Sequence, residues 1–210
     1  MSRTALGTVL GGLLLAAPAH AVGQDRPAPP DAPPAGTASS SAPSGAPEAV
    51  VETKKGRFTI RLLPDVAPKH VALFVKTAKA GGYDGTTFHR VITGGIIQGG
   101  DPLSKDTAKA SRYGTGGLGL LKAEFSDRPF VRGTVAAVRR PSSVDSAGTQ
   151  FFVCLQPQPA LQGQYTVFGE VVEGMEVVDQ ISLTPADGDK ATERVGMTVT
   201  LREPASAAAP

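Results

Sequence analysis

Several short stretches of the chain alternate apolar and polar residues with the two-residue period of a β-strand. In one of them, apolar Phe58, Ile60 and Leu62 are separated by single polar residues, as expected of a strand with one buried face. A second apolar run, residues 49–52, precedes it and is joined to it around Lys54-Lys55-Gly56. We expect further strands at residues 87–91, 96–99, 134–138, 150–155, 167–172 and 197–202.

One longer stretch has the period of an α-helix instead. Pro68 can occupy its first turn, where a missing N–H costs nothing, and Gly81 ends the pattern. Between them the apolar residues recur with helical spacing, at Val71, Phe74, Val75 and Ala78. A second, shorter helix is expected at residues 175–181, after Gly174.

The order of these elements bears on the fold class. Strands outnumber helices and do not alternate with them one for one, which argues against a parallel sheet built from βαβ units. The chain is therefore expected to be mainly β, as a closed, mostly antiparallel barrel capped by two helices.

The first 21 residues have the features of a secretory signal peptide. Arg3 supplies positive charge, an apolar run covers residues 6–17, and Ala19-His20-Ala21 has the form of a cleavage site. The run is too short to cross a bilayer, although an uncleaved anchor is the alternative interpretation. We expect a bacterial protein that is exported to the periplasm or secreted. The alternative that this signal also permits is a eukaryotic secretory route.

Residues 22–47 consist largely of Pro, Ala, Ser and Gly, with almost no large apolar side chain. Such a segment cannot bury enough surface to offset its chain entropy, so we expect a disordered linker. It is either an inert spacer or an arm that binds a partner. Residues 205–210 are expected to form a disordered tail, which leaves residues 48–204 as one folded domain.

Composition narrows the classes of function. A formal charge of +2 over 210 residues gives no sign of a nucleic-acid-binding surface, and no nucleic-acid partner is expected. No membrane contact is expected once the signal peptide is removed. The single cysteine, Cys154, has no partner for an internal disulfide and lies in an apolar run, so we expect a buried thiol.

Common site motifs are either out of context or absent from the sequence. Residues 114–119 satisfy the pattern G-x-G-x-x-G, but no strand precedes them and no helical pattern follows, which favours a flexible loop over a dinucleotide site. Neither G-x-S-x-G nor H-E-x-x-H occurs. A metal site is not expected, because His20 leaves with the signal peptide, His70 is predicted on the helix surface, and His89 is predicted to be structural.

The most informative segment is residues 88–101, which carries Arg90 and Gln98 eight positions apart on otherwise apolar, glycine-rich chain. Taken alone, Arg90 would be interpreted as a solvated edge arginine or as half of a surface ion pair. Two further segments, GTQFFV at residues 148–153 and YTVFG at residues 165–169, complete a pattern. Together the three segments resemble the core of the cyclophilin-type peptidyl-prolyl cis-trans isomerases.

That resemblance, which spans nearly all of residues 50–201, implies both a fold and an activity. The implied fold is a closed eight-stranded antiparallel barrel with a helix over each end. The implied activity is faster cis–trans rotation of X–Pro bonds, here in exported proteins as they fold. Arg90 and Gln98 would be catalytic residues, with Gln98 holding the peptide backbone. The substrate-binding residues that it implies are Ile96, Gln150, Phe152, Leu161 and Tyr165.

The chemistry of this reaction needs no cofactor or metal. An X–Pro bond rotates slowly because amide resonance imposes a barrier of about 18–20 kcal/mol. In the twisted state the prolyl nitrogen regains a lone pair, to which the permanently charged Arg90 can donate a hydrogen bond. The expected partners are therefore proline-containing polypeptides, and we expect the protein to act as a monomer.

Several positions depart from the family pattern around the proline pocket. Gly95 stands where the family usually has a large aromatic residue, and Ala160 stands where many members have an aromatic one. Both departures favour an alternative function, a non-catalytic module that binds proline-containing peptides on the same fold. The adjacent Arg139 and Arg140 either bias the groove toward acidic peptides or are solvated loop charges. Residues 105–111 resemble an insertion relative to compact members.

Overall fold

The computed structural model describes residues 45–202 of the 210-residue chain. The predicted signal peptide (1–21), residues 22–44 of the predicted linker and the predicted tail (205–210) lie outside the described residues. Within the described range, no helix is both long and apolar enough to cross a membrane.

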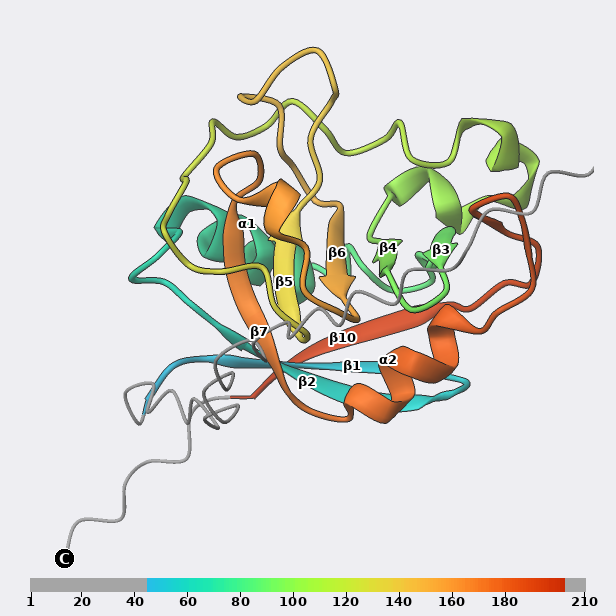
Figure 1. Ribbon diagram of the computed structural model, residues 1–210. Coiled ribbons are helices and arrows are strands. Elements are labelled where there is room, and N and C mark those ends of the chain that lie inside the picture. The colour runs from blue at the N-terminus through green and yellow to red at the C-terminus, as the bar shows by residue number, and fades with distance from the viewer. Residues whose placement is uncertain (1–44, 203–210) are drawn as a thin grey trace, which may run out of the picture. The chain divides into compact units, whose positions relative to one another are not determined.

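Ten strands form one antiparallel sheet (Figure 1). Along the sheet their order is β10-β1-β2-β7-β5-β6-β4-β3-β9-β8. The strands are β1 (Glu48–Thr53), β2 (Gly56–Leu62), β3 (Arg90–Ile92), β4 (Ile96–Gly99), β5 (Thr134–Ala137), β6 (Phe151–Cys154), β7 (Val167–Glu173), β8 (Ala186–Asp187), β9 (Lys190–Ala191) and β10 (Met197–Arg202). The alternation predicted for β2 is seen in its burial: Phe58, Ile60 and Leu62 all point into the core.

The expected closed barrel of eight strands is wrong in two respects. Ten strands are present because the two-residue strands β8 and β9 form an extra hairpin beside β3. The order is also open, since the end strands β10 and β8 do not pair within the described part of the chain. Instead, the chain before β3 meets the chain before β10 through an isolated bridge between Thr87 and Gly196. The Met197 N–H adds a hydrogen bond to the Thr86 carbonyl at 2.8 Å.

The strand predicted at residues 87–91 begins three residues later than expected, with β3 at Arg90. The Thr87 N–H donates to the hydroxyl of Ser104 at 2.9 Å, and the Phe88 N–H donates to the Val195 carbonyl at 3.0 Å. These partners lie outside the strands, so the chain enters the sheet only at Arg90.

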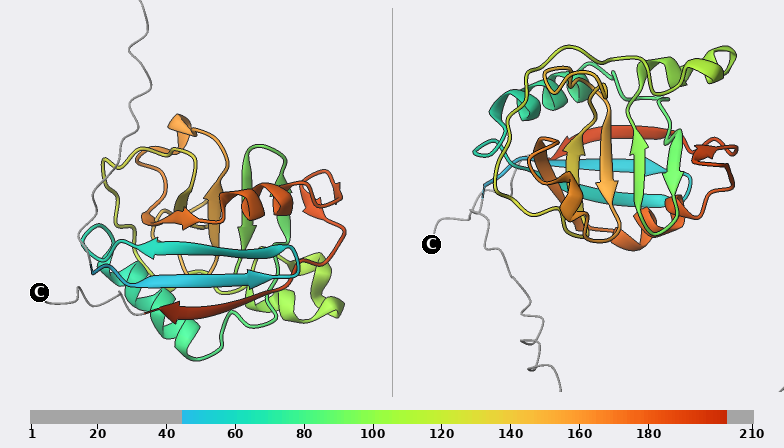
Figure 2. Two further views of the ribbon diagram at one scale, coloured as in Figure 1. Left: turned by 90° about the horizontal axis from the view of Figure 1, so that it is seen from below. Right: turned by 45° about the horizontal axis from the view of Figure 1, so that its top comes forward.

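Two α-helices lie at opposite ends of the curved sheet, as Figure 2 shows, and buried residues of both belong to the same hydrophobic core. They are α1 (Pro68–Lys79) and α2 (Met175–Ser182), which confirms both helices predicted from the sequence. The buried face of α1 carries Val71, Phe74 and Ala78. At the start of α2, Gly174 has a φ of 81°, and a Cβ on it would lie 2.5 Å from the Arg57 carbonyl oxygen.

His70 is buried, which corrects its predicted place on the surface of the helix. Its Nδ1 lies 2.6 Å from Oε2 of Glu124, which comes from the long segment before β5, residues 113–133. The same carboxylate accepts the backbone N–H groups of Lys69 and His70 at 3.1 Å. Ala67 provides no side-chain cap, so Glu124 caps the N-terminus of α1 from a distant part of the chain. The loop that carries Glu124 and covers this face of α1 has no periodic pattern, so the sequence did not indicate that His70 would be buried.

An aromatic cluster in the core joins α1 to the sheet. The ring of Phe74 lies 4.9 Å from Tyr83, 5.8 Å from Phe151 and 5.5 Å from Phe168, measured between ring centroids. Cys154 in β6 is fully buried, as predicted, and burial raises the pKa of its thiol to about 12. The predicted insertion, residues 105–111, begins at the last residue of one 3₁₀-helix, Pro102–Lys105, and covers most of a second, Thr107–Arg112.

Candidate active site

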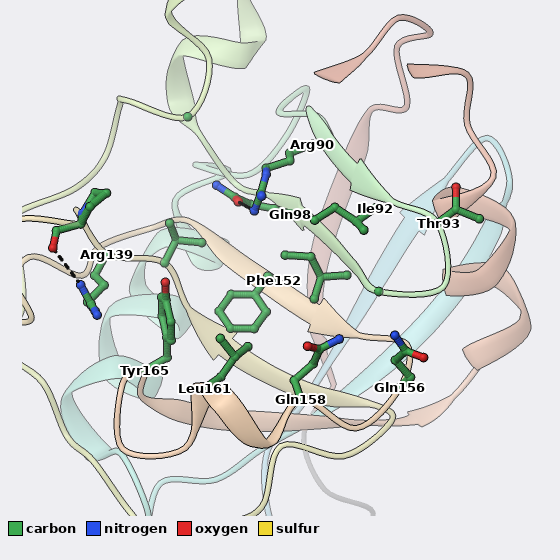
Figure 3. A pocket seen from close by; sticks show the side chains of 15 residues that line it. Arg90, Ile92, Thr93, Gln98, Arg139, Phe152, Gln156, Gln158, Leu161 and Tyr165 are labelled. Atoms are coloured by element: carbon green, nitrogen blue, oxygen red, sulfur yellow. Dashed lines mark hydrogen bonds between the residues drawn. The ribbon is translucent and has the colours of Figure 1, made fainter. Parts of the chain in front are cut away.

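A cavity of about 640 Å³ lies against strands β3, β4 and β6, and its floor is apolar. In Figure 3, Phe152 from β6 occupies the centre, with Leu161 and Tyr165 beside it. The rings of Phe152 and Tyr165 meet edge to face with centroids 5.4 Å apart, and Phe130 stacks on Phe152 at 6.3 Å. Ile96 also lines the cavity. Four of the five predicted substrate-binding residues therefore share one surface.

Arg90 and Gln98 lie at the same edge of this cavity because they are paired across the β3–β4 hairpin. Residues directly opposite each other in an antiparallel pair project to the same face of the sheet. The register therefore explains the spacing of eight positions seen in the sequence. Nη1 of Arg90 lies 3.4 Å from Oε1 of Gln98, and Gln98 itself is buried.

Gln150, the fifth predicted substrate-binding residue, lies behind Gln98 rather than among the residues that line the cavity. Nε2 of Gln98 donates to Oε1 of Gln150 at 3.0 Å. Nε2 of Gln150 in turn donates to the Gly116 carbonyl at 2.7 Å. These two bonds fix the orientation of the Gln98 amide, so Oε1 of Gln98 is the atom that faces Arg90.

Arg90 has a second partner that the sequence reasoning missed. Its Nε donates to Oδ2 of Asp189 at 2.6 Å. The β8–β9 hairpin holds Asp189 there, because Lys190 pairs with Arg90 and the Val91 N–H donates to the Asp189 carbonyl at 2.8 Å. The hydrogen bond from Arg90 lowers the pKa of the Asp189 carboxyl. Asp187-Gly188 is a strong signal for a tight hairpin turn, and it was available in the sequence.

Ile92 occupies space beside Gly95, where the family pattern led us to expect a missing wall. A Cβ built on Gly95 would lie 2.8 Å from Cγ2 of Ile92, and both residues line the cavity. The Ile92 side chain is 40% exposed although it is large and apolar. Ile92 was not among the predicted site residues, because nothing in its own strand distinguishes it from an ordinary edge residue.

The two ends of the cavity differ in charge. At one end, the guanidinium carbon of Arg139 lies 4.8 Å from the centroid of the Tyr165 ring. At the other end, Figure 3 shows the uncharged side chains of Thr93, Gln156 and Gln158. Ala160 is exposed in the short 3₁₀-helix Pro159–Leu161, which brings Leu161 into the cavity.

The glycine-rich segment at residues 114–119 forms one rim, and Gly114 lines the cavity. The buried carboxylate of Asp101 accepts the N–H groups of Gly114 at 2.5 Å and Gly116 at 3.2 Å. A Cβ on Gly116 would lie 2.3 Å from Oδ1 of Asp101, so only glycine allows this approach. The loop is therefore tied down by side-chain hydrogen bonds.

Residues 49–201 match the model of a family described as "Cyclophilin type peptidyl-prolyl cis-trans isomerase/CLD". The chain belongs to this cyclophilin family. It is accordingly an enzyme of the peptidyl-prolyl cis-trans isomerase class, the function that the Arg90 and Gln98 pattern predicted.

Curated relatives of this cyclophilin carry the same activity in their names. The chain is 47% identical over 137 residues to a "probable peptidyl-prolyl cis-trans isomerase" of Brucella suis, which covers 63% of this chain and 69% of the relative. It is 40% identical over 134 residues to a peptidyl-prolyl cis-trans isomerase of Synechococcus elongatus, which covers 62% of this chain and 86% of the relative.

Solved cyclophilin structures share the fold. A cyclophilin-type isomerase of Cryptosporidium parvum superimposes with a TM-score of 0.67 at 24% identity, covering 76% of this chain and 98% of the other. A second structure of the Cryptosporidium protein, solved in the presence of the dipeptide Ala-Pro, gives a TM-score of 0.66 at 25% identity, covering 74% and 99% of the two chains.

His89 directly precedes Arg90 in the chain but does not line the cavity. It is buried, and burial lowers the pKa of its imidazole, while the nearby Asp101 acts in the opposite direction. The ring is therefore largely neutral at pH 7. Within residues 45–202, no group of three or more His, Cys, Asp or Glu side chains is placed to hold a metal ion.

Proposed function

We propose that this cyclophilin accelerates X–Pro rotation in exported proteins and that Arg90 stabilises the twisted amide. The observation that supports the role of Arg90 is its position. It is a charged donor held at the edge of an apolar cavity that is large enough for a proline ring. Proline-containing polypeptides are the substrates, and the protein acts as a monomer.

The guanidinium of Arg90 has donors left for a substrate. It carries five N–H groups, of which Nε binds Asp189 and one on Nη1 points to Gln98. No acceptor within residues 45–202 takes the N–H groups of Nη2. An X–Pro peptide whose proline ring rests on Phe152 would present its prolyl nitrogen to these free donors.

A hydrogen bond to that nitrogen favours the twisted state over the planar one, which is the requirement for catalysis. Acceleration by about 10⁴-fold corresponds to roughly 5.4 kcal/mol at 1.36 kcal/mol per decade. One preorganised charged donor would supply about 2–4 kcal/mol of this. Fixing the proline ring on the apolar floor while the preceding carbonyl rotates would supply the rest.

Arg90→Ala tests the role of the guanidinium. Loss of about 2–4 kcal/mol predicts a fall in kcat/KM of about 30- to 1000-fold for a short Ala–Pro peptide. Arg57→Ala is the matched control, because Arg57 is an exposed arginine in β2 and does not line the cavity. An Arg90→Ala protein that retained more than a third of the wild-type kcat/KM would contradict the proposal.

Export rests on the signal-like residues 1–21 and is tested separately. Full-length protein expressed in a bacterium should appear in the periplasm or medium, with its mature chain starting after Ala21. A chain lacking residues 1–21 should stay in the cytoplasm. Retention of uncleaved full-length protein in the cytoplasm would contradict this part of the proposal.

The alternative of a non-catalytic binding module rested on Gly95 and Ala160. Ile92 now stands beside Gly95, so the wall is partly replaced. The relatives named as isomerases add support to the enzyme. Peptide binding without any acceleration of X–Pro exchange would favour the module instead.

A further inference from the structure

Arg139 places a fixed positive charge at one end of the cavity. Its Nε donates to the Gln164 carbonyl at 2.8 Å, and Nη1 donates to the carbonyls of Arg140 at 3.1 Å and Pro141 at 3.4 Å. Nη2 reaches Oε1 of Gln164 at 3.4 Å. The Tyr165 ring packs against the guanidinium. Hydrogen bonds from all three guanidinium nitrogens and the contact with the ring therefore hold the head group in one orientation.

All of these partners are neutral. No carboxylate among residues 45–202 lies within ion-pair distance of Arg139 or Arg140. None of the residues that line the cavity is Asp or Glu. The other arginine of the cavity, Arg90, differs because Asp189 balances its charge. The site therefore carries a net positive charge that is located at Arg139.

One donor of Arg139 is also unused by the protein. Four of its five guanidinium N–H groups have acceptors within the described chain, which leaves one on Nη2. Figure 3 shows the side chain beside Tyr165, directly next to the apolar floor. A peptide whose proline rests on Phe152 would carry its neighbouring residue past this donor.

We propose that Arg139 makes this enzyme select X–Pro substrates with an acidic residue immediately before or after the proline. The inference rests on the proposed function, because it assumes that the proline ring occupies the cavity described above. Asp or Glu would accept the free N–H and would neutralise the charge, whereas Lys or Arg at the same position would be repelled. Arg140 contributes less, because its side chain is exposed, lines no part of the cavity and donates to the Leu118 carbonyl at 3.3 Å.

The test compares peptides that differ only in charge. One series carries Glu, Ala or Lys before the proline, and a second series carries them after it. We expect Glu to exceed Ala in kcat/KM by about fivefold in at least one series, as an interaction of about 1 kcal/mol gives, and Lys to fall below Ala. The preference should shrink when NaCl is raised from about 0.05 to about 0.5 M.

Variants separate charge from shape. Arg139→Gln should bring the Glu-to-Ala ratio close to one, whereas Arg139→Lys should keep most of the preference. Arg57→Ala, the control on β2, should leave the ratio unchanged. Because the readout is a ratio of substrates, a loss of folded protein that lowers all rates equally does not imitate the expected result.

Two outcomes would overturn the inference. Equal kcat/KM values for Glu, Ala and Lys in both series would do so, as would a Glu preference that survives in Arg139→Gln. Neither outcome depends on the proposed role of Arg90, which is judged by Arg90→Ala on the uncharged Ala–Pro peptide alone. A failure of one proposal is therefore distinguishable from a failure of the other.

Discussion

Replacing Asp189 by Asn removes the charge that faces Arg90 while keeping nearly the same shape. The side chains of Arg90 and Asp189 are 38% and 45% exposed, so solvent screens the pair. Its contribution to the free energy of unfolding should be only about 0.2–1 kcal/mol, and the melting temperature should change little. The catalytic effect should be larger, because the pair orients the guanidinium that would meet the prolyl nitrogen.

We expect Asp189→Asn to lower kcat/KM by about five- to tenfold, or roughly 1–1.4 kcal/mol, mainly through kcat. The effect should be flat from pH 5 to pH 8, because the Arg90 hydrogen bond lowers the pKa of the Asp189 carboxyl and the group stays ionised throughout that range. The assay is isomerisation of an uncharged Ala–Pro peptide, with the circular dichroism melting curve as a check of folding.

A double-mutant comparison decides whether Asp189 acts through Arg90. In an Arg90→Ala background, Asp189→Asn should cause no further loss, since the group to be positioned is gone. An undiminished loss in that background would refute the positioning role. An Asp189→Asn enzyme with the wild-type rate would refute it too, because Asp189 would then contribute nothing to catalysis. A faster variant would mean that the carboxylate weakens Arg90 as a donor.

Two further predictions concern the pocket wall and the cap of α1. Ile92→Ala should raise KM for Ala–Pro peptides by about three- to tenfold with a small change in kcat. The reason is that burial of the proline ring worth about 1 kcal/mol is lost beside Gly95. An unchanged KM would show that Ile92 is not part of the pocket wall. Glu124→Ala should lower the free energy of unfolding by about 1–3 kcal/mol at pH 7, because buried His70 and the first N–H groups of α1 lose their acceptor. Burial acts to raise the pKa of the Glu124 carboxyl, but its hydrogen bonds with His70 and Lys69 leave that pKa below the ordinary 4.5. The stabilisation is therefore complete above that value and is lost as pH falls through the lowered pKa, so the difference from wild type in urea unfolding should be large at pH 7 and should shrink as the pH is lowered step by step below 4.5.

Local pattern was enough to predict both helices and the strand that carries Gln98, and it placed the start of the strand that carries Arg90 three residues too early. The spacing of their apolar residues reflects contacts within one element, which a single sequence records directly. The predicted lining residues Ile96, Phe152 and Tyr165 required more, because only a family resemblance linked segments that lie far apart in the chain.

The features that were missed depend on contacts between distant segments. Asp189 lies 99 positions from Arg90, and no local signal says which strand its hairpin joins. Ile92 matters only because Gly95 leaves space beside it, which is a property of the pair and not of either residue. His70 was assigned to the surface because the loop carrying Glu124 has no periodicity, although it covers that face of α1.

The two arginines of the cavity show why residue type alone does not assign a role. Both have a guanidinium at the rim of one apolar floor, and both are held by several hydrogen bonds. Arg90 has a carboxylate partner, so it adds a directed donor without adding net charge to the site. Arg139 has only neutral partners, so its long-range field stays available to a charged peptide. Balancing the charge suits a residue that must act on every X–Pro bond, whereas leaving it unbalanced suits one that discriminates between the residues beside the proline.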